Sequence, residues 1–478
     1  MFSLGPLILL CAAALLWIRS DTTAWGHRAR RILQAEPACG ADARPNVLLV
    51  SLDTLRADSI GSYGGPIPTP NLDRVAAEGA LFQVAVAPAS ETAPSHATLF
   101  TGRRVLAHGV RKNGISLPME ADTLAERFRE AGWTTGAFVS SFVLDPRFGW
   151  GQGFAHFDAE FPRRLASFDV DTVWNPDAFW REHRVEGFDR PGVWTARAAR
   201  DWFARAERPF FAFVHLFDAH EPHAPLRPLR RRVADLELDV SGRWLPGQSP
   251  REVEAWNRAY LSDVLAADEA LGELLAPISS AALAPCTLLV VTGDHGQGLG
   301  QHGWLGHEIS LYEEQLRVPL LFHWPGHVLP GRRIDVPVGL EDVAPTIVAL
   351  AGLPSLTDTH GGSLQPLLRS GVAPPRGPLF ARRRHYEQPM LGHRGHQNAI
   401  RTTAWKYIRS SHAPDELYYL ARDPAELRNV LAQRPRVARR LGAELDAWLA
   451  AAPVSQSEET EPLPADVRRG LEALGYVD

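Results

Sequence analysis

The sequence predicts an α/β protein with a large, doubly wound, mixed sheet flanked by helices, and a smaller C-terminal α+β subdomain. Three apolar, β-branched runs each end in an aspartate: NVLLVSLD at 46–53, PFFAFVHLFD at 209–218 and TLLVVTGD at 287–294. Unbroken apolar runs of this kind are typical of parallel strands that are buried on both faces. Because helical segments separate them, they indicate a doubly wound sheet whose ligands bind beyond the carboxyl ends of the strands.

Three segments between these strands predict helices. Residues 69–79 (TPNLDRVAAEG) and 121–132 (ADTLAERFREAG) both end in a glycine, which often follows the last helical residue. In 90–102 (SETAPSHATLFTG), Pro94 suits the first helical position and Gly102 the position after the last.

The pattern changes beyond about residue 375. Residues 399–408 and 416–420 predict short strands, and 437–451 an amphipathic helix. We therefore expect a catalytic domain over 45–375 and an α+β subdomain over 376–478. Two further segments, 160–192 and 225–254, read as insertions near strand ends that would frame a substrate entrance.

Residues 1–25 predict a signal peptide or a membrane anchor, followed by an Arg-rich linker over 26–44. The apolar run 4–18 is shorter than the roughly 20 residues that a membrane-spanning helix needs. Basic residues follow this run and none precedes it, so an uncleaved anchor fits about as well as a signal peptide. The positive-inside rule would then keep most of the chain in the cytoplasm. On balance we expect export or membrane anchoring, with a periplasmic or extracellular location.

Composition excludes some partners. The formal net charge is -5 and the basic residues are scattered, so no nucleic-acid surface is expected. Cys11, Cys39 and Cys286 are too few for a disulfide framework and match no zinc-site spacing. Cys11 and Cys286 lie in or beside apolar segments, so both are expected to be inert.

Asp53, Asp218 and Asp294 end the three predicted strands, at the edge where ligands bind. A single aspartate in such a place is more often a turn or cap residue. A buried carboxylate is costly, however, unless it is paired or bound to a metal. His295 follows Asp294 directly, and this oxygen-and-nitrogen pair suits Zn²⁺, Mn²⁺, Mg²⁺ or Ca²⁺.

Thr92 stands just ahead of the helix predicted to open at Pro94. Free N–H groups and the helix dipole favour an anion at such a position. A hydroxyl bound there to a metal can lose its proton and attack phosphorus or sulfur. Taken alone, Thr92 is explained as well by a simple helix cap.

Several motifs together resemble the sulfatase family of the alkaline phosphatase superfamily. They are PNVLLVSLDTLRADSIGSYG from residue 45, TAPSHATLFTG from 92, TGDHGQGLGQHG from 292 and SLYEEQLRVPLL from 310. AHEPHAP, GGSLQPLL, AWKYI, ELYYLARDPAELRNV and LEALGYV add to the resemblance, which runs in the family's order from about Pro45 to the C-terminus. It implies a large α/β catalytic domain with a four-stranded C-terminal subdomain.

The resemblance also implies roles for individual residues. Asp53, Asp294 and His295 match the family's metal ligands, and Thr92 matches the nucleophile, which also binds the metal. Asn113 lies 21 residues after Thr92, where superfamily phosphodiesterases place an asparagine that binds a substrate oxygen.

Two histidines complete the implied site. His220 matches the substrate-binding histidine of the family's DPH-type loop. His307 lies near the usual position of a lysine, where it would bind the transferring group or protonate the leaving oxygen. A core or surface histidine is an equally good explanation of His307.

The chain also departs from the sulfatase pattern. Thr92 to His96 read TAPSH, where sulfatases carry C/S-x-P-S-R and oxidise the first residue to formylglycine. Oxidised threonine would be a ketone and not an aldehyde, so a direct threonine nucleophile is expected. Thr54 replaces an acidic metal ligand, and a Lys-x-His pair is missing from 136–142. These changes lower the positive charge that would hold a sulfate.

A direct threonine nucleophile resembles that of superfamily phosphodiesterases and of phosphoglycerol or phosphoethanolamine transferases. Those enzymes often use two metals roughly 4 Å apart. The sequence does not assign a second metal site, and its candidate ligands are Asp218, His220, His223, His302 and His307.

The predicted function is hydrolysis of sulfate or phosphate esters with one or two divalent ions, acting on a small-molecule, glycan or lipid ester. One alternative is a transferase that passes a phospho-group onto an envelope glycan or lipid, which the N-terminal apolar segment favours. A second alternative, motivated by Thr54 and the missing Lys-x-His pair, is an inactive binding protein of the same fold.

Overall fold

The computed structural model describes residues 44–161, 188–223, 227–279, 283–372, 376–390, 393–451 and 465–473. The predicted N-terminal segment 1–25 lies outside the described residues, as do nearly all of the linker and most of the insertion 160–192. In the described part of the chain, no helix combines the length and the apolar character that crossing a bilayer requires.

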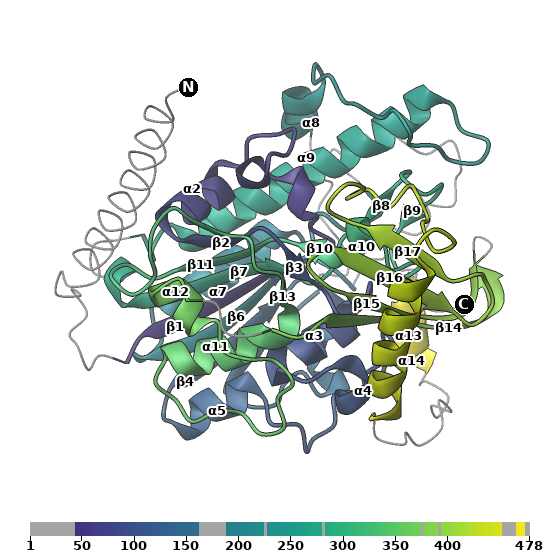
Figure 1. The fold of residues 1–478 in the computed structure, drawn as a ribbon. Helices are drawn as coiled ribbons and strands as arrows, with labels where there is room; N and C mark the ends of the chain where they lie inside the picture. Colours follow the sequence, from purple (N-terminus) through teal and green to yellow (C-terminus); the bar gives the residue numbers. More distant parts are fainter. Residues whose placement is uncertain are drawn as a thin grey trace, which may run out of the picture.

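The three predicted strands form the centre of an eight-stranded sheet (Figure 1). β1 (Asn46–Leu52) lies between β7 (Thr287–Gly293) and β6 (Phe210–Leu216) and is parallel to both. All residues of these three strands are buried, because helices cover both faces of the sheet.

The outer strands make the sheet mixed, in the order β12-β2-β11-β7-β1-β6-β4-β5. β4 (Thr134–Val139) and β5 (His156–Asp158) continue the parallel side beyond β6. On the other side β11 (Leu320–His323) runs antiparallel to β7 and to β2 (Ala80–Phe82), and β12 (Arg332–Ile334) is parallel to β2. The predicted fold class is confirmed.

Alternate side chains of the central strands feed two apolar layers. Leu48 and Val50 belong to the layer formed with α2 (Pro70–Glu78), α7 (Gly192–Phe203) and α9 (Pro250–Leu275). Val47 and Leu49 belong to the opposite layer, formed with α3 (Thr92–Thr101), α5 (Leu124–Glu130) and α11 (Val343–Leu350). This alternation follows from the two-residue period of a strand.

The remaining elements surround this sheet. α5 begins later than the predicted segment because Thr123 caps it: its hydroxyl accepts from Glu126 N–H (3.2 Å), and the Glu126 carboxylate accepts from Thr123 N–H (3.1 Å). The short elements are β3 (Ala85–Val86), β10 (Arg317–Val318), β13 (Val338–Gly339), β8 (Gly298–Leu299), β9 (Leu305–Gly306), α4 (Val105–His108), α8 (Arg227–Val233), α10 (Glu313–Leu316) and α12 (Gln365–Arg369).

The C-terminal part contains the expected four-stranded antiparallel sheet. Its strands, in spatial order, are β14 (Leu379–Met390), β15 (His393–Arg401), β16 (Trp405–Ser410) and β17 (Glu416–Tyr419). α13 (Pro435–Ala450) packs on the sheet through Leu441 and Leu445, and α14 (Ala465–Ala473) follows. The prediction of one strand over 399–408 is wrong, because a turn in which Trp405 N–H donates to the Thr402 hydroxyl (3.0 Å) divides it into β15 and β16.

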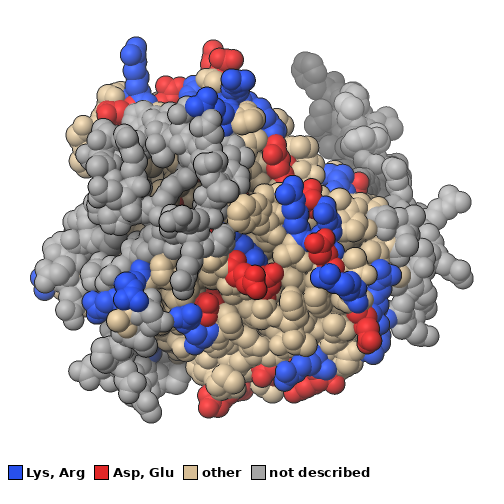
Figure 2. Space-filling view, turned by 180° about the vertical axis from the view of Figure 1, so that it is seen from behind, with Lys and Arg blue, Asp and Glu red and all other residues tan. Residues whose placement is uncertain are grey.

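Acidic and basic side chains are interspersed on the surface. Figure 2 shows this on the face opposite to that of Figure 1, where basic side chains (blue) and acidic side chains (red) lie among uncharged residues. Such mixing agrees with the mild net charge of the chain.

Buried ion pairs join the C-terminal sheet to the main domain. The Lys406 ammonium on β16 lies 3.2 Å from a carboxylate oxygen of Glu313 and 3.1 Å from one of Glu426. The Lys406 side chain is only 1% exposed. Arg401 supplies a second cation to Glu313, at 3.2 Å.

Lys406→Met is therefore expected to destabilise the protein by about 3–5 kcal/mol, because it leaves two carboxylates buried with one cation fewer. Urea unfolding measures the loss. Arg409→Met on the same strand is the control: its partner Asp446 is 63% exposed, so the expected cost is at most about 1 kcal/mol. Equal losses of stability in the two variants would contradict the stabilising role of the Lys406 ion pairs.

Candidate active site

Two aspartates meet where β1 and β7 end side by side. Asp53 and Asp294 follow these strands, and neither is exposed to solvent. One oxygen of Asp294 accepts the N–H groups of Thr54 (3.1 Å) and His295 (2.7 Å). Thr54 adopts a left-handed backbone (φ 53°), and its hydroxyl donates to the Asp53 carbonyl (2.8 Å), so it contributes an N–H here and not a ligand oxygen.

Two aspartate oxygens without a hydrogen-bond donor are the strongest indication of a cation site. Within the described structure, Asp53 Oδ1 and Asp294 Oδ2 are buried without a hydrogen-bond donor. Burial raises the pKa of both carboxyl groups, and for Asp294 the charge of Asp53 adds to the rise. Buried carboxylate oxygens of this kind normally bind a partner. A divalent cation therefore fits the residues present.

His295 supplies a nitrogen to the same point. Its Nδ1 donates to the Gly296 carbonyl (3.0 Å), which directs Nε2 toward the aspartates. Nε2 lies 3.5 Å from Asp294 Oδ2 and 3.9 Å from Asp53 Oδ1. Burial alone would lower the pKa of His295, but Asp294 and Asp53 raise it. The pocket thus favours positive charge, and the predicted ligand atoms of these three residues all lie within 4.8 Å of one another.

Thr92 faces this group from the start of α3. Its hydroxyl is 3.4 Å from Asp53 Oδ2 and 3.4 Å from His295 Nε2. The prediction that Thr92 precedes the helix is wrong: Thr92 is the first helical residue, and Pro94 the third. Pro94 is tolerated there because the first four N–H groups of a helix lack a partner inside it.

Two further histidines contact the residues of this site. The sequence did not assign either of them to it. His215 on β6 places Nε2 3.0 Å from Asp53 Oδ2. His96 Nδ1 donates to the Thr92 carbonyl (2.8 Å), and its Nε2 accepts from the Ser51 hydroxyl (2.9 Å). Burial lowers the pKa of both imidazoles to about 4, so both are neutral at physiological pH. A histidine inside an otherwise apolar strand was the available signal for His215.

Asn113 lies beside the nucleophile position, but its contacts are with the protein. Its Oδ1 accepts from Ala93 N–H (2.8 Å), and its Nδ2 donates to Glu308 Oε1 (3.2 Å). This arrangement caps α3 and leaves the second N–H of the amide to meet a ligand.

An acidic pair held by the C-terminal sheet forms the adjoining wall. Arg384 on β14 lies 3.0 Å from Glu308 Oε2 and 3.6 Å from Glu91 Oε1, and the Tyr386 hydroxyl donates to Glu308 Oε2 (3.1 Å). Burial raises the pKa of Glu91 to about 8, with a further contribution from Glu308. Sequence reasoning missed these four residues. Only Glu91, next to Thr92, carried a local signal.

His220 and His307 come together near the metal-ligand candidates. Their Nε2 atoms are 2.8 Å apart, and the His307 ring centre lies 4.7 Å from that of His295. A hairpin formed by β8 and β9 leads into His307. Part of the insertion 225–254 contacts this hairpin, since Trp244 N–H donates to the Gly300 carbonyl (2.8 Å).

The other candidates for a second metal site lie elsewhere. Asp218 does not join the strand-end aspartates, because β6 already ends at Leu216 and the Asp218 carboxylate accepts Gly192 N–H (3.0 Å). His223 pairs with Asp263 (3.0 Å), and His302 with Glu314 (2.9 Å).

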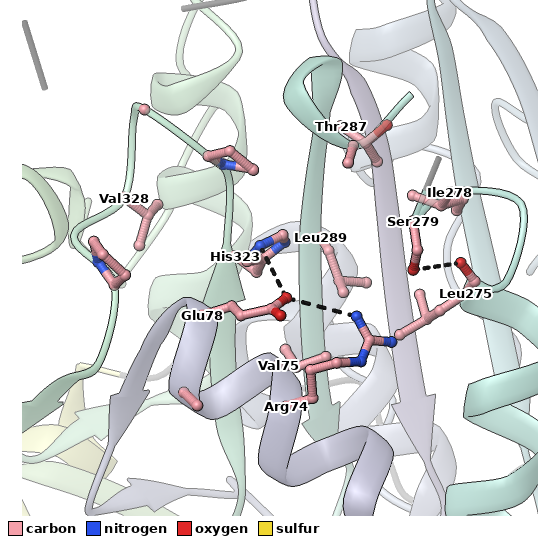
Figure 3. A pocket seen from close by; sticks show the side chains of 15 residues that line it. Arg74, Val75, Glu78, Leu275, Ile278, Ser279, Thr287, Leu289, His323 and Val328 are labelled. Atoms are coloured by element: carbon pink, nitrogen blue, oxygen red, sulfur yellow. Dashed lines mark hydrogen bonds and ion pairs between the residues drawn. The ribbon is translucent and has the colours of Figure 1, made fainter. Parts of the chain in front are cut away.

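A cavity of about 560 Å³ opens at the amino-terminal end of β7, away from the carboxyl ends where the candidate site lies (Figure 3). It is lined in part by Thr287 at the start of β7, by Glu78 and by His323, which lies 3.9 Å from Glu78. The seven residue-to-residue steps from Thr287 to Asp294 span roughly 23 Å in a strand. None of the site residues described above lines this cavity.

The comparisons with known proteins agree with this geometry. The sequence profile of the sulfatase family matches residues 45–353, and that of the C-terminal region of N-sulphoglucosamine sulphohydrolase matches 300–451. Human arylsulfatase A is 29% identical over 459 residues, which cover 84% of this chain and 86% of that protein. The N-acetylglucosamine-6-O-sulfatase of Bacteroides thetaiotaomicron is 25% identical over 482 residues, covering 84% and 85% of the two chains.

Among solved structures, the phosphonate monoester hydrolase of Agrobacterium radiobacter superposes with a TM-score of 0.70 at 24% identity, covering 86% of this chain and 96% of that one. This chain therefore shares the large mixed sheet and the small antiparallel sheet of that fold. Because the sulfatase profile covers more than half of the chain, the chain belongs to the sulfatase family of the alkaline phosphatase superfamily, whose enzymes hydrolyse ester bonds and use a divalent metal.

Proposed function

We propose that this protein hydrolyses phosphorus esters in preference to sulfate esters and that Thr92 is its nucleophile. The observation that carries the proposal is the Thr92 hydroxyl, which lies 3.4 Å from both Asp53 Oδ2 and His295 Nε2 at the start of a helix. Threonine cannot be oxidised to the aldehyde that sulfatases use, which favours direct attack by its hydroxyl.

Asp53, Asp294, His295 and Thr92 would hold a divalent cation, drawn from Ca²⁺, Zn²⁺, Mn²⁺ and Mg²⁺. Such a cation lowers the pKa of a hydroxyl bound to it and neutralises charge on the transferring group. Asp53 Oδ2 accepts the Thr92 hydroxyl in the structure, which gives the departing proton a path.

In the proposed reaction, Thr92 Oγ1 forms a bond to phosphorus while the bond to the leaving alcohol breaks in line. We assign to His220 and His307 the contact with the transferring group, and to His307 the protonation of the leaving oxygen. Asn113 donates its second N–H to a substrate oxygen. Water then hydrolyses the threonine ester and regenerates the hydroxyl.

The substrate class is proposed from relatives and chemistry together. Similar proteins are named for N-acetylglucosamine sulfate and for phosphonate monoesters. Fixed positive charge is scarce at the site because His96 is neutral and Arg384 is paired with Glu308 and Glu91. A small-molecule, glycan or lipid phosphoester is therefore our proposal.

Location and domain limits are part of the same proposal. We place the catalytic domain at 45–375 and the subdomain at 376–478, in a chain that is exported. Cys286 is disulfide-bonded. Disulfides are typical of oxidising compartments, which supports export.

A substrate panel tests the proposal. Purified enzyme is assayed with an aryl sulfate, a phosphate monoester, a phosphate diester and a phosphonate monoester in the presence of each of the four metals. At least one phosphorus ester is expected to exceed the sulfate by roughly tenfold or more in kcat/KM, which corresponds to about 1.4 kcal/mol of transition-state binding. Activity confined to the aryl sulfate would overturn the preference. A modified acceptor in place of hydrolysed product would indicate a transferase. Absence of both turnover and metal binding would indicate an inactive protein.

A further inference from the structure

We propose that Glu308 is a positioning residue, which holds the side-chain amide of Asn113 so that one of its N–H groups stays available to a substrate oxygen. The proposal rests on the proposed function, because it concerns the residue to which that function assigns the substrate oxygen. It also gives a role in turnover to Arg384 and Tyr386 of the C-terminal sheet, which hold Glu308 in turn.

The Asn113 side chain is fixed in one orientation. Its Oδ1 accepts from Ala93 N–H (2.8 Å), its Nδ2 donates to Glu308 Oε1 (3.2 Å), and its backbone N–H donates to the Glu91 carboxylate (3.2 Å). Because Ala93 N–H can only donate and the Glu308 carboxylate accepts, the two ends of the amide cannot exchange places. The two N–H groups share the amide plane, so the contact with Glu308 also sets the direction of the second one.

The backbone of Glu308 adopts a conformation that few side chains tolerate. Its φ is 70°, in the left-handed region where residues other than glycine are uncommon. On one side its N–H donates to the Ser90 carbonyl (3.0 Å), and on the other its carbonyl accepts the Tyr386 hydroxyl (3.3 Å). Strained residues of this kind persist only where their surroundings hold them, and they cluster at functional sites. The backbone of Glu308 therefore supports a role that depends on where its carboxylate lies.

The C-terminal sheet fixes the Glu308 carboxylate. Arg384 lies 3.0 Å from Oε2, and the Tyr386 hydroxyl donates to the same oxygen (3.1 Å), which leaves Oε1 for Asn113. The Arg384 guanidinium also lies over the Tyr386 ring, 4.2 Å from its centre. A guanidinium stacked in this way has few orientations open to it. The chain of contacts thus runs from β14 through Glu308 to Asn113.

A fixed donor matters most where negative charge develops. A donor that is already in place stabilises the charge of the transition state without reorganising at the moment of reaction. Misplacement by about 1 Å can cost roughly 100-fold in rate. Loss of the Glu308 carboxylate should therefore lower kcat more than it raises KM, although Glu308 is not assigned any contact with the substrate.

A double-mutant cycle on kcat/KM tests the proposal, with the phosphorus ester that the enzyme cleaves best. Asn113→Ala is expected to lower kcat/KM by roughly 10²- to 10³-fold, and Glu308→Ala by roughly 10- to 100-fold. In the Asn113→Ala background, Glu308→Ala is expected to cost less than about twofold more, because the group that it positions is gone. A merely structural role would give the same loss in both backgrounds.

Two further variants accompany the cycle. Glu308→Asp retains the charge and suits a left-handed backbone, yet its shorter side chain cannot reach both Arg384 and Asn113, so a loss of about tenfold or more is expected. Glu341→Ala is the matched control, since Glu341 is another glutamate that is 3% exposed and pairs with an arginine, Arg104, at 3.4 Å. It is expected to change kcat/KM by less than about twofold in either background. Circular dichroism shows whether each variant is folded.

The outcomes separate this proposal from the proposed function. Losses that multiply in the double variant, or wild-type rates in Glu308→Asp, would overturn the positioning role and leave the nucleophile untouched. An Asn113→Ala variant with full activity would likewise overturn it. The proposed function fails instead if Thr92→Ala keeps wild-type rates, whatever the cycle gives. An enzyme that turns over no ester of the panel would overturn both.

Discussion

Thr92→Ala is expected to reduce kcat/KM by roughly 10⁴-fold or more on every ester that the enzyme cleaves, because removing a covalent nucleophile leaves only binding and electrostatic catalysis. Metal binding is expected to persist, since Asp53, Asp294 and His295 keep their three ligand atoms together. Steady-state kinetics and metal analysis on the same preparation measure both effects.

Two further variants control for this result. Thr92→Ser retains the hydroxyl and is expected to keep activity within about tenfold of the wild type, whereas a helix cap alone predicts little change in either variant. Thr98→Ala changes a buried threonine of the same helix whose hydroxyl lies 3.0 Å from His108 Nε2. It measures the cost of losing a threonine from α3 away from the site. Wild-type rates in Thr92→Ala would show that Thr92 only caps the helix.

Asp294→Asn is expected to remove metal binding and to lower turnover at least ~10³-fold, yet to stabilise the metal-free protein. The aspartate pKa is raised in the folded state by burial and by Asp53. The protonated carboxyl group of Asp294 therefore stabilises the fold below the pKa that it has in the unfolded chain. This contribution is lost as the pH rises through the pKa that it has in the folded protein. Above the unfolded pKa, the buried carboxyl group therefore destabilises the metal-free fold. Asparagine keeps an oxygen for the Thr54 and His295 N–H groups and removes the charge.

Thermal melts with and without metal measure both parts of this prediction. At about 1,000 times the dissociation constant, a metal stabilises the folded wild type by about 4 kcal/mol, and this gain should vanish in the variant. Asp218→Asn is the matched control, because Asp218 follows the neighbouring strand but its carboxylate accepts Gly192 N–H (3.0 Å) and does not join the two aspartates. Equal stabilisation of Asp294→Asn and wild type by metal would remove Asp294 from the ligands.

The central sheet and half of the site could be predicted because their signals are local. An apolar run that ends in aspartate places a carboxylate at the strand end, and His295 follows Asp294 directly. Asp218 shows the limit of this rule, since two residues beyond the strand suffice to turn a side chain away. The start of α3 was misplaced because Pro94 is compatible with more than one position in the first turn.

The wall beside Thr92 could not be predicted because it joins three distant segments. Glu91, Glu308 and Arg384 carry no motif, and only the packing of β14 against the main domain brings the guanidinium to the two carboxylates. The left-handed backbone of Glu308 likewise depends on contacts with residues far away in the sequence.

The position of Arg384 and Tyr386 on β14 has a practical consequence for engineering. Because this strand holds Glu308, and Glu308 holds Asn113, a fragment that stops before the second sheet would lose part of its active-site wall. Trimming the C-terminal subdomain would therefore remove the Arg384 and Tyr386 contacts of Glu308. Exchange of that subdomain between relatives would instead alter the surroundings of Glu308 and Asn113, which makes β14 a place to begin when the substrate range is to be changed.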